Sequence, residues 1–562
     1  MNRLWVVVAF LGIALIAGII LLGGPGYQAL AQDNPPTQTP LPSFPGEPLS
    51  TQQDTFFSGS GACTGCHTNM TDESGADVSI DAFWRSTMMA NAARDPYWQA
   101  SVRAETLNLP QYEAVIEDKC ATCHMPMARF TLAEQGDQAL VLDSGLSDPD
   151  SSLHSLAMDG NSCTLCHQIL AVELGEQESF SGHFSIDTQR PMGERLAFSR
   201  FGVPQNFANV MLAASGFDPV QGAHIVQAGL CATCHTLYTP YVDASKAIVG
   251  TFPEQMPFFE WMHGDYGQNS ACQTCHMPQA QGGVVTSITG GVPREPFAQH
   301  VFVGGNAYMM SIFQAFGEDM SVTASSEHFE ATHARTINQL RNRAAIISVE
   351  NIGVAEGRLS ANVVIQTTTG HKFPTGFPSR RVWLHVTVTD GEGAVVFESG
   401  AVGDEGRIIG DDHDDDAARY EPHHKVIYQP EDVQIYQSIM VDTENNVTDT
   451  LLHGAGYIKD NRLLPAGFDK TTAAPEIAVD ALAFEDANFV GGGDRTMYSI
   501  DVSERPGPFT VTAELLYQSI GYRWILKLSA YESEETTRFI NYYSAVPNDP
   551  VVIDSITSTV SE

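Results

Sequence analysis

All ten cysteines of the chain belong to one repeated pattern, Cys-x-x-Cys-His. Two thiols three residues apart on one helical turn can each add to a vinyl group of the same porphyrin, and the adjoining histidine can then bind the iron as proximal ligand. Disulfides and zinc sites also use paired cysteines. Neither requires a histidine after the second thiol, yet all five pairs have one, so the pattern predicts five covalently bound c-type haems. The predicted attachment residues are Cys63, Cys66 and His67; Cys120, Cys123 and His124; Cys163, Cys166 and His167; Cys231, Cys234 and His235; and Cys272, Cys275 and His276.

The five motifs lie between Cys63 and His276, which leaves little chain for each haem. A segment so short cannot build an ordinary apolar core around five large groups. We therefore expect the haems themselves to be the core, wrapped by short helices and loops. Neighbouring porphyrins should then approach closely enough to pass electrons.

The second axial ligand of each iron must come from elsewhere in the chain. The sequence contains eighteen histidines, and five of them are the proximal ligands. A histidine shortly before a Cys-x-x-Cys-His motif is well placed to serve a neighbouring haem, although each such residue could equally be an ordinary surface or core histidine. Methionine is the other soft ligand, and it raises the potential of c-type haems, but it is more often core filler. The distal candidates are His154, His224 and His263, which precede a motif; His183 and His300, which follow the third and fifth motifs; and Met88, Met89, Met125 and Met127.

With these motifs in place, residues 56–305 resemble the multihaem cytochromes c of the cytochrome c-554 and hydroxylamine oxidoreductase superfamily. The similarity includes Trp84 after the first motif and the stretches CTLCHQI around Cys163 and CQTCHMP around Cys272. In that family a histidine five positions after the tryptophan binds a neighbouring iron, and here Met89 stands at that position. The resemblance implies either His/Met ligation at one haem or a missing ligand.

Members of this superfamily are electron carriers or oxidoreductases of small nitrogen and sulfur compounds. The enzymes leave one haem open on its distal side, and some replace the motif histidine by lysine. This chain has no Cys-x-x-Cys-Lys motif, and it resembles a pentahaem cytochrome of the c-552 or c-554 kind with an added C-terminal β-domain. We expect an electron-transfer protein rather than an enzyme, with a small-molecule oxidoreductase as the alternative.

The elements that position these residues change in type along the chain. Residues 325–343 have the apolar spacing of a helix. From residue 345 onward, β-branched and partly alternating stretches such as 359–365 and 382–388 predict strands. The fold class expected is α+β: a mainly helical pentahaem domain at 56–344, followed by an antiparallel, immunoglobulin-like β-sandwich at 345–562.

Two features of the predicted β-domain could carry chemistry. The stretch from Gly370 to Gly376 resembles the G-H-x-x-P-T-G loop of β-domains attached to multihaem cytochromes, which can contribute a distal histidine. His371 is therefore a candidate ligand that would join the two domains. The run of Asp411, Asp412, Asp414, Asp415 and Asp416 offers oxygen ligands for Ca²⁺. It lacks the EF-hand spacing, however, and a solvated charge run is the alternative.

The N-terminus reads as a targeting segment. Arg3 precedes an apolar run from Leu4 to Leu22, and Ala29-Leu30-Ala31 suits signal cleavage. Two interpretations are open for residues 1–31: a cleaved signal peptide, or an uncleaved membrane anchor, since the run approaches the length of a bilayer span. Residues 32–55 are rich in Pro and Thr and suggest an extended linker. Both interpretations place the rest of the chain on the periplasmic or extracellular side of the membrane.

Composition narrows the function classes further. The chain has 562 residues, with 29 Lys and Arg against 67 Asp and Glu, so its formal net charge is −38. This charge excludes nucleic acid as a partner, because nucleic-acid binding needs a basic face. It favours basic redox partner proteins instead. A third function that stays open is a structural role, in which copies of the chain assemble into a larger electron-conducting array.

Overall fold

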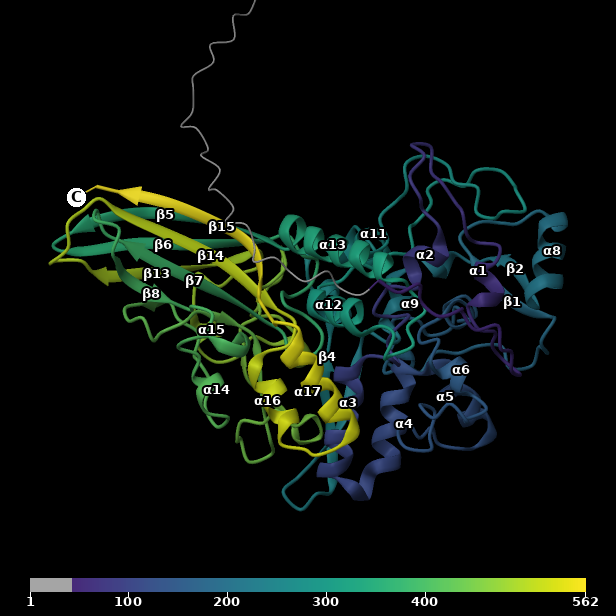
Figure 1. Ribbon diagram of the computed structural model, residues 1–562. Helices are drawn as coiled ribbons and strands as arrows, with labels where there is room; N and C mark the ends of the chain where they lie inside the picture. The colour runs from purple at the N-terminus through teal and green to yellow at the C-terminus, as the bar shows by residue number, and fades with distance from the viewer. Residues whose placement is uncertain (1–42, 562) are drawn as a thin grey trace, which may run out of the picture. The chain divides into compact units, whose positions relative to one another are not determined.

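Short helices and loops make up the first half of the structure, a computed structural model that describes residues 43–561 (Figure 1). Two small sheets interrupt them: β1 (Arg195–Ser199) pairs in parallel with β2 (Phe217–Gln221), and β3 (Leu237–Val242) pairs antiparallel with β4 (Ile248–Gln255). The helices of this half are α1 (Gly61–Thr64), α2 (Ile80–Trp84), α3 (Pro96–Asn108), α4 (Glu113–His124), α5 (Pro126–Gln135), α6 (His154–Ala157), α7 (Cys163–Cys166), α8 (Gln205–Ser215), α9 (Ala228–Ala232), α10 (Pro257–Met262), α11 (Cys272–His276), α12 (Ala307–Phe316) and α13 (Ser326–Arg343).

The longer helices begin at residues that suit a helix start. The Asp95 carboxylate accepts hydrogen bonds from the backbone N–H groups of Tyr97 and Trp98 at the start of α3, and Pro96 occupies the first helical position. Ser325 caps α13 in the same way. The helix predicted at 325–343 is therefore confirmed within one residue.

The second half is built mainly from strands. The strands predicted around 359–365 and 382–388 are both present, and each runs longer than the sequence pattern indicated. The strands are β5 (Ala345–Ala355), β6 (Arg358–Thr367), β7 (Arg381–Thr389), β8 (Val395–Ser399), β9 (Val426–Ile427), β10 (Ile435–Tyr436), β11 (Ser438–Val441), β12 (Gly456–Asp460), β13 (Gly493–Asp501), β14 (Phe509–Gln518) and β15 (Val551–Val560).

Two larger sheets organise these strands. One has the order β5-β6-β13-β9, and the other has the order β10-β7-β14-β15, with β8 also paired to β7. Pairing is antiparallel throughout, except that β9 runs parallel to β13 over two residue pairs. The α+β class is therefore confirmed, while immunoglobulin-like topology stays a prediction.

A single apolar core lies between these sheets. In β6, residues such as Leu359, Val363 and Ile365 are buried, whereas their sequence neighbours are more exposed. In β14, Val511 and Ala513 face the same core. This alternation follows from the period of two in a strand, which sends successive side chains to opposite faces.

The second half also contains four helices, none of which the sequence pattern had indicated: α14 (Asp412–Asp415), α15 (Leu482–Glu485), α16 (Tyr522–Ser529) and α17 (Glu534–Ala545). Of these, α16 and α17 pack against helices of the first half. Helix α17 packs against α3, where Arg103 and Glu535 form an ion pair of 2.9 Å. All described residues accordingly cluster into one compact unit. The boundary at 344/345 stays a prediction.

The predicted targeting segment at 1–31 and most of the linker lie outside the described residues. Within residues 43–561, no helix combines the length and the apolar character needed to cross a bilayer.

Candidate haem-binding site

Each Cys-x-x-Cys-His motif coincides with a helical turn, as its proposed chemistry requires. Helices α7 and α11 and the end of the longer α4 contain both cysteines of their motifs. Helices α1 and α9 end after the first cysteine, and the turn continues as the N–H groups of His67 and His235 donate to the carbonyls of Cys63 and Cys231. A helical turn brings residues three apart to the same face. The two thiols of each motif can therefore approach one porphyrin from the same side.

All five motifs open into one cavity. Its volume is about 1320 Å³, above the range of roughly 300–1,000 Å³ typical of pockets for single small ligands. All ten cysteines and all five motif histidines line it. The ten thiols are free, so none is committed to a disulfide. Residues, cavity and free thiols together fit several covalently held haems.

Thiols of different motifs meet inside this cavity. The side chains of Cys63 and Cys163 lie close to each other, and this interaction lowers the pKa of Cys63. Likewise Cys123 contacts Cys234, which raises the pKa of Cys123 well above its ordinary value. A third contact joins Cys231 of the fourth motif to Cys272 of the fifth.

Backbone contacts support the same neighbours. The Thr164 hydroxyl, within the third motif, donates to the carbonyl of Ser58, just before the first motif, at 2.7 Å. The Gly182 N–H donates at 2.6 Å to the carbonyl of Thr233 in the fourth motif, while its Cα lies against Thr122 of the second. The motifs are thus adjacent as first with third, second with fourth, and fourth with fifth.

Backbone carbonyls orient four of the five motif histidines. A carbonyl oxygen can only accept, so each Nδ1 that lies against one carries the proton and leaves Nε2 free for a metal. Burial lowers the pKa of His124 to about 4 and also lowers that of His167, which keeps both rings neutral. The Nδ1 contacts are His67 with Thr286 (2.6 Å), His124 with Ala92 (2.9 Å), His167 with Phe198 (2.6 Å) and His276 with Val303 (2.6 Å).

Two motif histidines face a second histidine across the cavity. The rings of His167 and His300 are nearly parallel, with centroids 6.4 Å apart, and those of His276 and His371 are 6.2 Å apart. Metal–imidazole bonds are about 2.0–2.1 Å long, so each gap can hold one metal atom bound to both rings. His300 and His371 both line the cavity. These two distal candidates therefore lie where a ligand is needed.

The other distal candidates are placed differently. His154 is half-buried, and its Nδ1 donates to the carbonyl of Leu146 at 3.0 Å, which leaves Nε2 free. In contrast, His224 and His263 use Nε2 to contact the carbonyls of Ile169 and Asp469, at 2.8 and 2.9 Å. None of the three lines the cavity. The ligand roles of all three residues stay predictions. For His224 and His263, Nε2 can bind iron only after its hydrogen bond to the backbone carbonyl breaks.

Methionine and cationic side chains complete the cavity wall. Met89, the candidate that replaces the family's histidine, lines the cavity, whereas His183 is exposed. Lys119, Arg343 and Arg380 also line it. Such cations suit the propionate groups of haem. Sequence reasoning did not single them out, because no local motif marks them.

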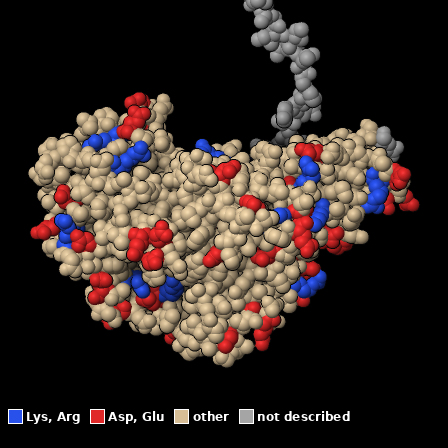
Figure 2. Space-filling view, turned by 180° about the vertical axis from the view of Figure 1, so that it is seen from behind, with Lys and Arg blue, Asp and Glu red and all other residues tan. Residues whose placement is uncertain are grey.

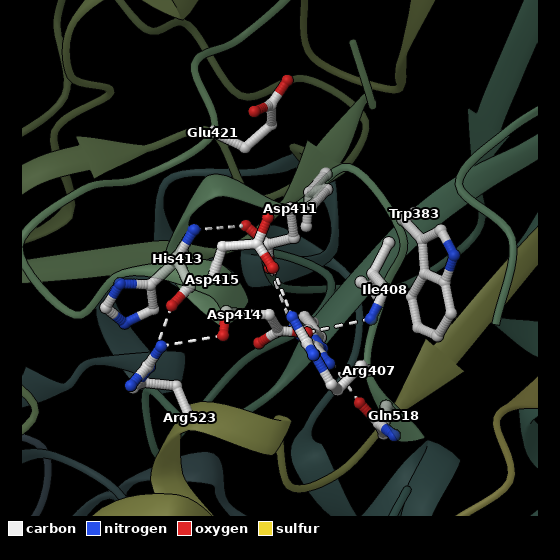
Figure 3. Close-up of polar contacts among 12 residues, drawn as sticks. Trp383, Arg407, Ile408, Asp411, His413, Asp414, Asp415, Glu421, Gln518 and Arg523 are labelled. Atoms are coloured by element: carbon white, nitrogen blue, oxygen red, sulfur yellow. Dashed lines mark hydrogen bonds and ion pairs between the residues drawn. The ribbon is translucent and has the colours of Figure 1, made fainter. Parts of the chain in front are cut away.

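The acidic run at 411–416 is neutralised by arginine. Buried Asp411 and Asp414 both contact the Arg381 guanidinium, at 3.0 and 2.8 Å. Asp412 pairs with Arg419 at 2.6 Å. Arg523 donates to the carbonyls of His413 and Asp414 (Figure 3). Asp415 pairs with Arg407, so four of the five carboxylates that could have bound Ca²⁺ already have a cationic partner, and the arrangement lends no support to the calcium expectation.

A buried histidine elsewhere in this half also has carboxylates around it. His423 lies near Asp486 and Asp494. Its Nδ1 faces the amide nitrogens of Gln434 and Asn461, at 2.9 and 3.1 Å. Backbone partners hold both amides in this orientation, so Nδ1 must accept and Nε2 must carry the proton. Nε2 then donates to Asp486 at 3.2 Å, which excludes it as a metal ligand in this state.

Comparison with known proteins gave one match. No protein family and no curated protein matches the chain. Among solved structures, the fold is similar to a penta-heme cytochrome c552 from Thermochromatium tepidum, with a TM-score of 0.48 and 15% identity, over 86% of this chain and 96% of that chain. A likeness at this level assigns no function to the chain.

Proposed function

We propose that the chain is a multihaem c-type cytochrome that transfers electrons between redox partner proteins. The observation that carries the proposal is the cavity into which all ten motif cysteines and all five motif histidines open. The cysteines would hold five haems by thioether bonds, and the motif histidines would be their proximal ligands. Bound haem iron supplies a one-electron redox couple.

The neighbour relations of the motifs support an electron path. The first motif adjoins the third, and the fourth adjoins both the second and the fifth. The third and fourth motifs also lie near each other. Burial is the main cause that raises the pKa of Cys166 in the third motif, and the charge of Cys234 in the fourth motif is the next. All five sites are therefore connected, in the order first, third, fourth, fifth, with the second as a branch at the fourth.

Histidine pairs favour electron transfer over catalysis. An iron with two axial histidines has no open position for a substrate. His300 and His371 would be the distal ligands opposite His167 and His276. A cytochrome of this type acts by keeping its ligand set unchanged while the electron moves.

A second candidate function is an oxidoreductase of a small nitrogen or sulfur compound. In the described part of the chain, the rings of His67, His124 and His235 have no second histidine stacked opposite them as at the other two sites. Met89, which lines the cavity, is a weaker ligand than histidine. An open iron at one of these three sites would bind such a substrate. Self-assembly into a larger array stays a prediction.

The proposal extends to location and partners. Covalent attachment of c-type haem takes place outside the cytoplasm, so we expect the protein on the periplasmic or extracellular side, held there by a signal or anchor at residues 1–31. Acidic side chains are spread over the surface with fewer basic ones between them (Figure 2). A basic redox partner suits this surface.

Haem content and CO binding test these functions. We expect the purified holoprotein to carry five covalent haems by intact mass, and its ferrous form to be low-spin and unchanged by CO. A protein without covalent haem contradicts both candidate functions. Stoichiometric CO uptake by a fully haem-loaded protein favours the oxidoreductase over the electron carrier.

A further inference from the structure

We propose that a chain of four buried charged side chains positions the imidazole of His371 opposite that of His276. This inference rests on the proposed function, in which both histidines are axial ligands of one haem. The four side chains are each less than a tenth exposed, and they are Lys372, Asp460, Arg462 and Glu260.

The chain of charged side chains begins at Lys372, the residue whose carbonyl holds the His371 ring. Nδ1 of His371 donates to the backbone carbonyl of Lys372 at 2.9 Å, so the ring can turn only if that carbonyl moves. The Lys372 ammonium is fully buried and donates to Asp460 at 2.7 Å and to the carbonyl of Ala478 at 2.9 Å. The side chain thus anchors the backbone that orients the ligand.

The chain of charged side chains then leads back to the loop of residues 370–376, which contains His371 and Lys372. Arg462 binds Asp460 through two nitrogens, at 2.9 and 2.7 Å, and pairs with Glu260 at 2.8 Å. The second oxygen of Glu260 accepts a hydrogen bond of 2.5 Å from the hydroxyl of Thr375. Both ends of the 370–376 loop are therefore fixed to one set of charges.

The same charged side chains also connect the 370–376 loop to the haem-binding half. Glu260 lies on α10, whose Trp261 packs against the same apolar cluster as Cys272 of the fifth motif. A side chain at Gly370 would approach Trp261 and Tyr266 to within 3.4–3.6 Å, so the loop lies directly on this region. The same charges that hold the loop are therefore anchored to the segment that leads into the motif of His276.

Positioning explains the ion chain better than stability does. Two cations and two anions balance, yet burying them costs desolvation that apolar residues of similar size would avoid. Buried ion networks are retained in some proteins because they specify one conformation. A ligand that must meet an iron opposite another histidine needs such a single conformation.

CO binding distinguishes a role of these charges in positioning His371 from a purely structural role. His371→Ala holoprotein should take up about one equivalent of CO beyond wild type, and free imidazole should suppress that uptake. Asp460→Asn removes the central anion without touching the ligand. It should show a smaller uptake at the same haem, again suppressed by imidazole, and Glu260→Gln should show a weaker effect of the same kind.

Asp414→Asn is the matched control. It also removes a buried carboxylate paired with arginine in this half of the chain, but it has no contact with the 370–376 loop. It should leave CO uptake at the wild-type level. Uptake in Asp414→Asn equal to that in Asp460→Asn would overturn the proposal, as would wild-type behaviour of both Asp460→Asn and Glu260→Gln, or of His371→Ala. Absence of covalent haem in wild type would instead overturn the proposed function.

Discussion

Arg381→Met leaves the buried carboxylates of Asp411 and Asp414 without their cationic partner, and it should destabilise the described β-rich half strongly. Arg381, Asp411 and Asp414 are 3%, 0% and 2% exposed. The guanidinium also donates to Gln518 at 2.9 Å and to the carbonyl of Gly406 at 3.0 Å. Removing one partner of a buried ion pair costs about 3–5 kcal/mol. We expect the upper part of that range, a large share of a typical stability of about 5–15 kcal/mol.

The deficit should grow with pH. Burial, together with neighbouring Asp414, raises the pKa of Asp411 from 3.8 to about 6 even with Arg381 present. A carboxyl whose pKa is higher in the folded state favours folding below its unfolded pKa, and this contribution is lost as pH rises through the folded value. Loss of the arginine raises the pKa of Asp411 further, so the variant should be penalised less at about pH 5 than at about pH 8.

Urea denaturation followed by circular dichroism measures this effect. The control is Arg407→Met, which breaks the more exposed pair of Arg407 with Asp415 and should cost no more than about 1 kcal/mol. A loss below about 1 kcal/mol for Arg381→Met at neutral pH would refute the reasoning, because buried charges without a partner are expected to cost more than that. An equal loss at both pH values would refute the pH dependence.

Four further predictions concern the cavity, a buried carboxylate and the surface. Replacing Cys120 and Cys123 together by serine should lower the haem count by one, measured by intact mass; an unchanged count would contradict attachment at this motif. His300→Ala should create a high-spin, CO-binding haem whereas His224→Ala should not, since only the first residue lines the cavity; the reverse result in absorption spectra would exchange their roles. Although burial opposes it, two neighbouring cations hold the pKa of Asp460 to about 2, below its ordinary 3.8. Its contribution of about 2 kcal/mol should therefore be present above about pH 4 and fade as pH falls through 2, and acid titration of Asp460→Asn should lack this loss. Reduction by a basic donor protein should slow as salt is added, and rates independent of ionic strength would speak against electrostatic docking.

Much of the architecture could be predicted because it depends on local patterns. The strands at 359–365 and 382–388 alternate or run apolar over enough residues to be recognised, and the helix at 325–343 has a serine cap and helical spacing. The helices α16 and α17 escaped prediction because their apolar faces are short and find partners on α3 and α12, far away in the sequence. The parallel pairing of β9 with β13 likewise escaped prediction, because β9 is only two residues long.

The distal ligands show the limit of local reasoning most clearly. His224 and His263 precede motifs at the same kind of spacing that pointed to His154, yet their Nε2 atoms meet backbone carbonyls in the fold. His371 lies far from any motif in sequence but faces His276 across the cavity. Spacing along the chain alone could not separate these cases.

The sequence by itself determined the chemistry of attachment. A Cys-x-x-Cys-His motif carries both thiols and the first ligand within five consecutive residues, so one helical turn is enough to place them. Only the tertiary structure decided which motifs are neighbours, which histidines face each other, and that arginines neutralise the acidic run at 411–416. Each of these depends on contacts between segments that are far apart in the sequence, such as those of His276 and His371. Such contacts arise only when separate segments are buried together, where a charge or a ring nitrogen must find a partner.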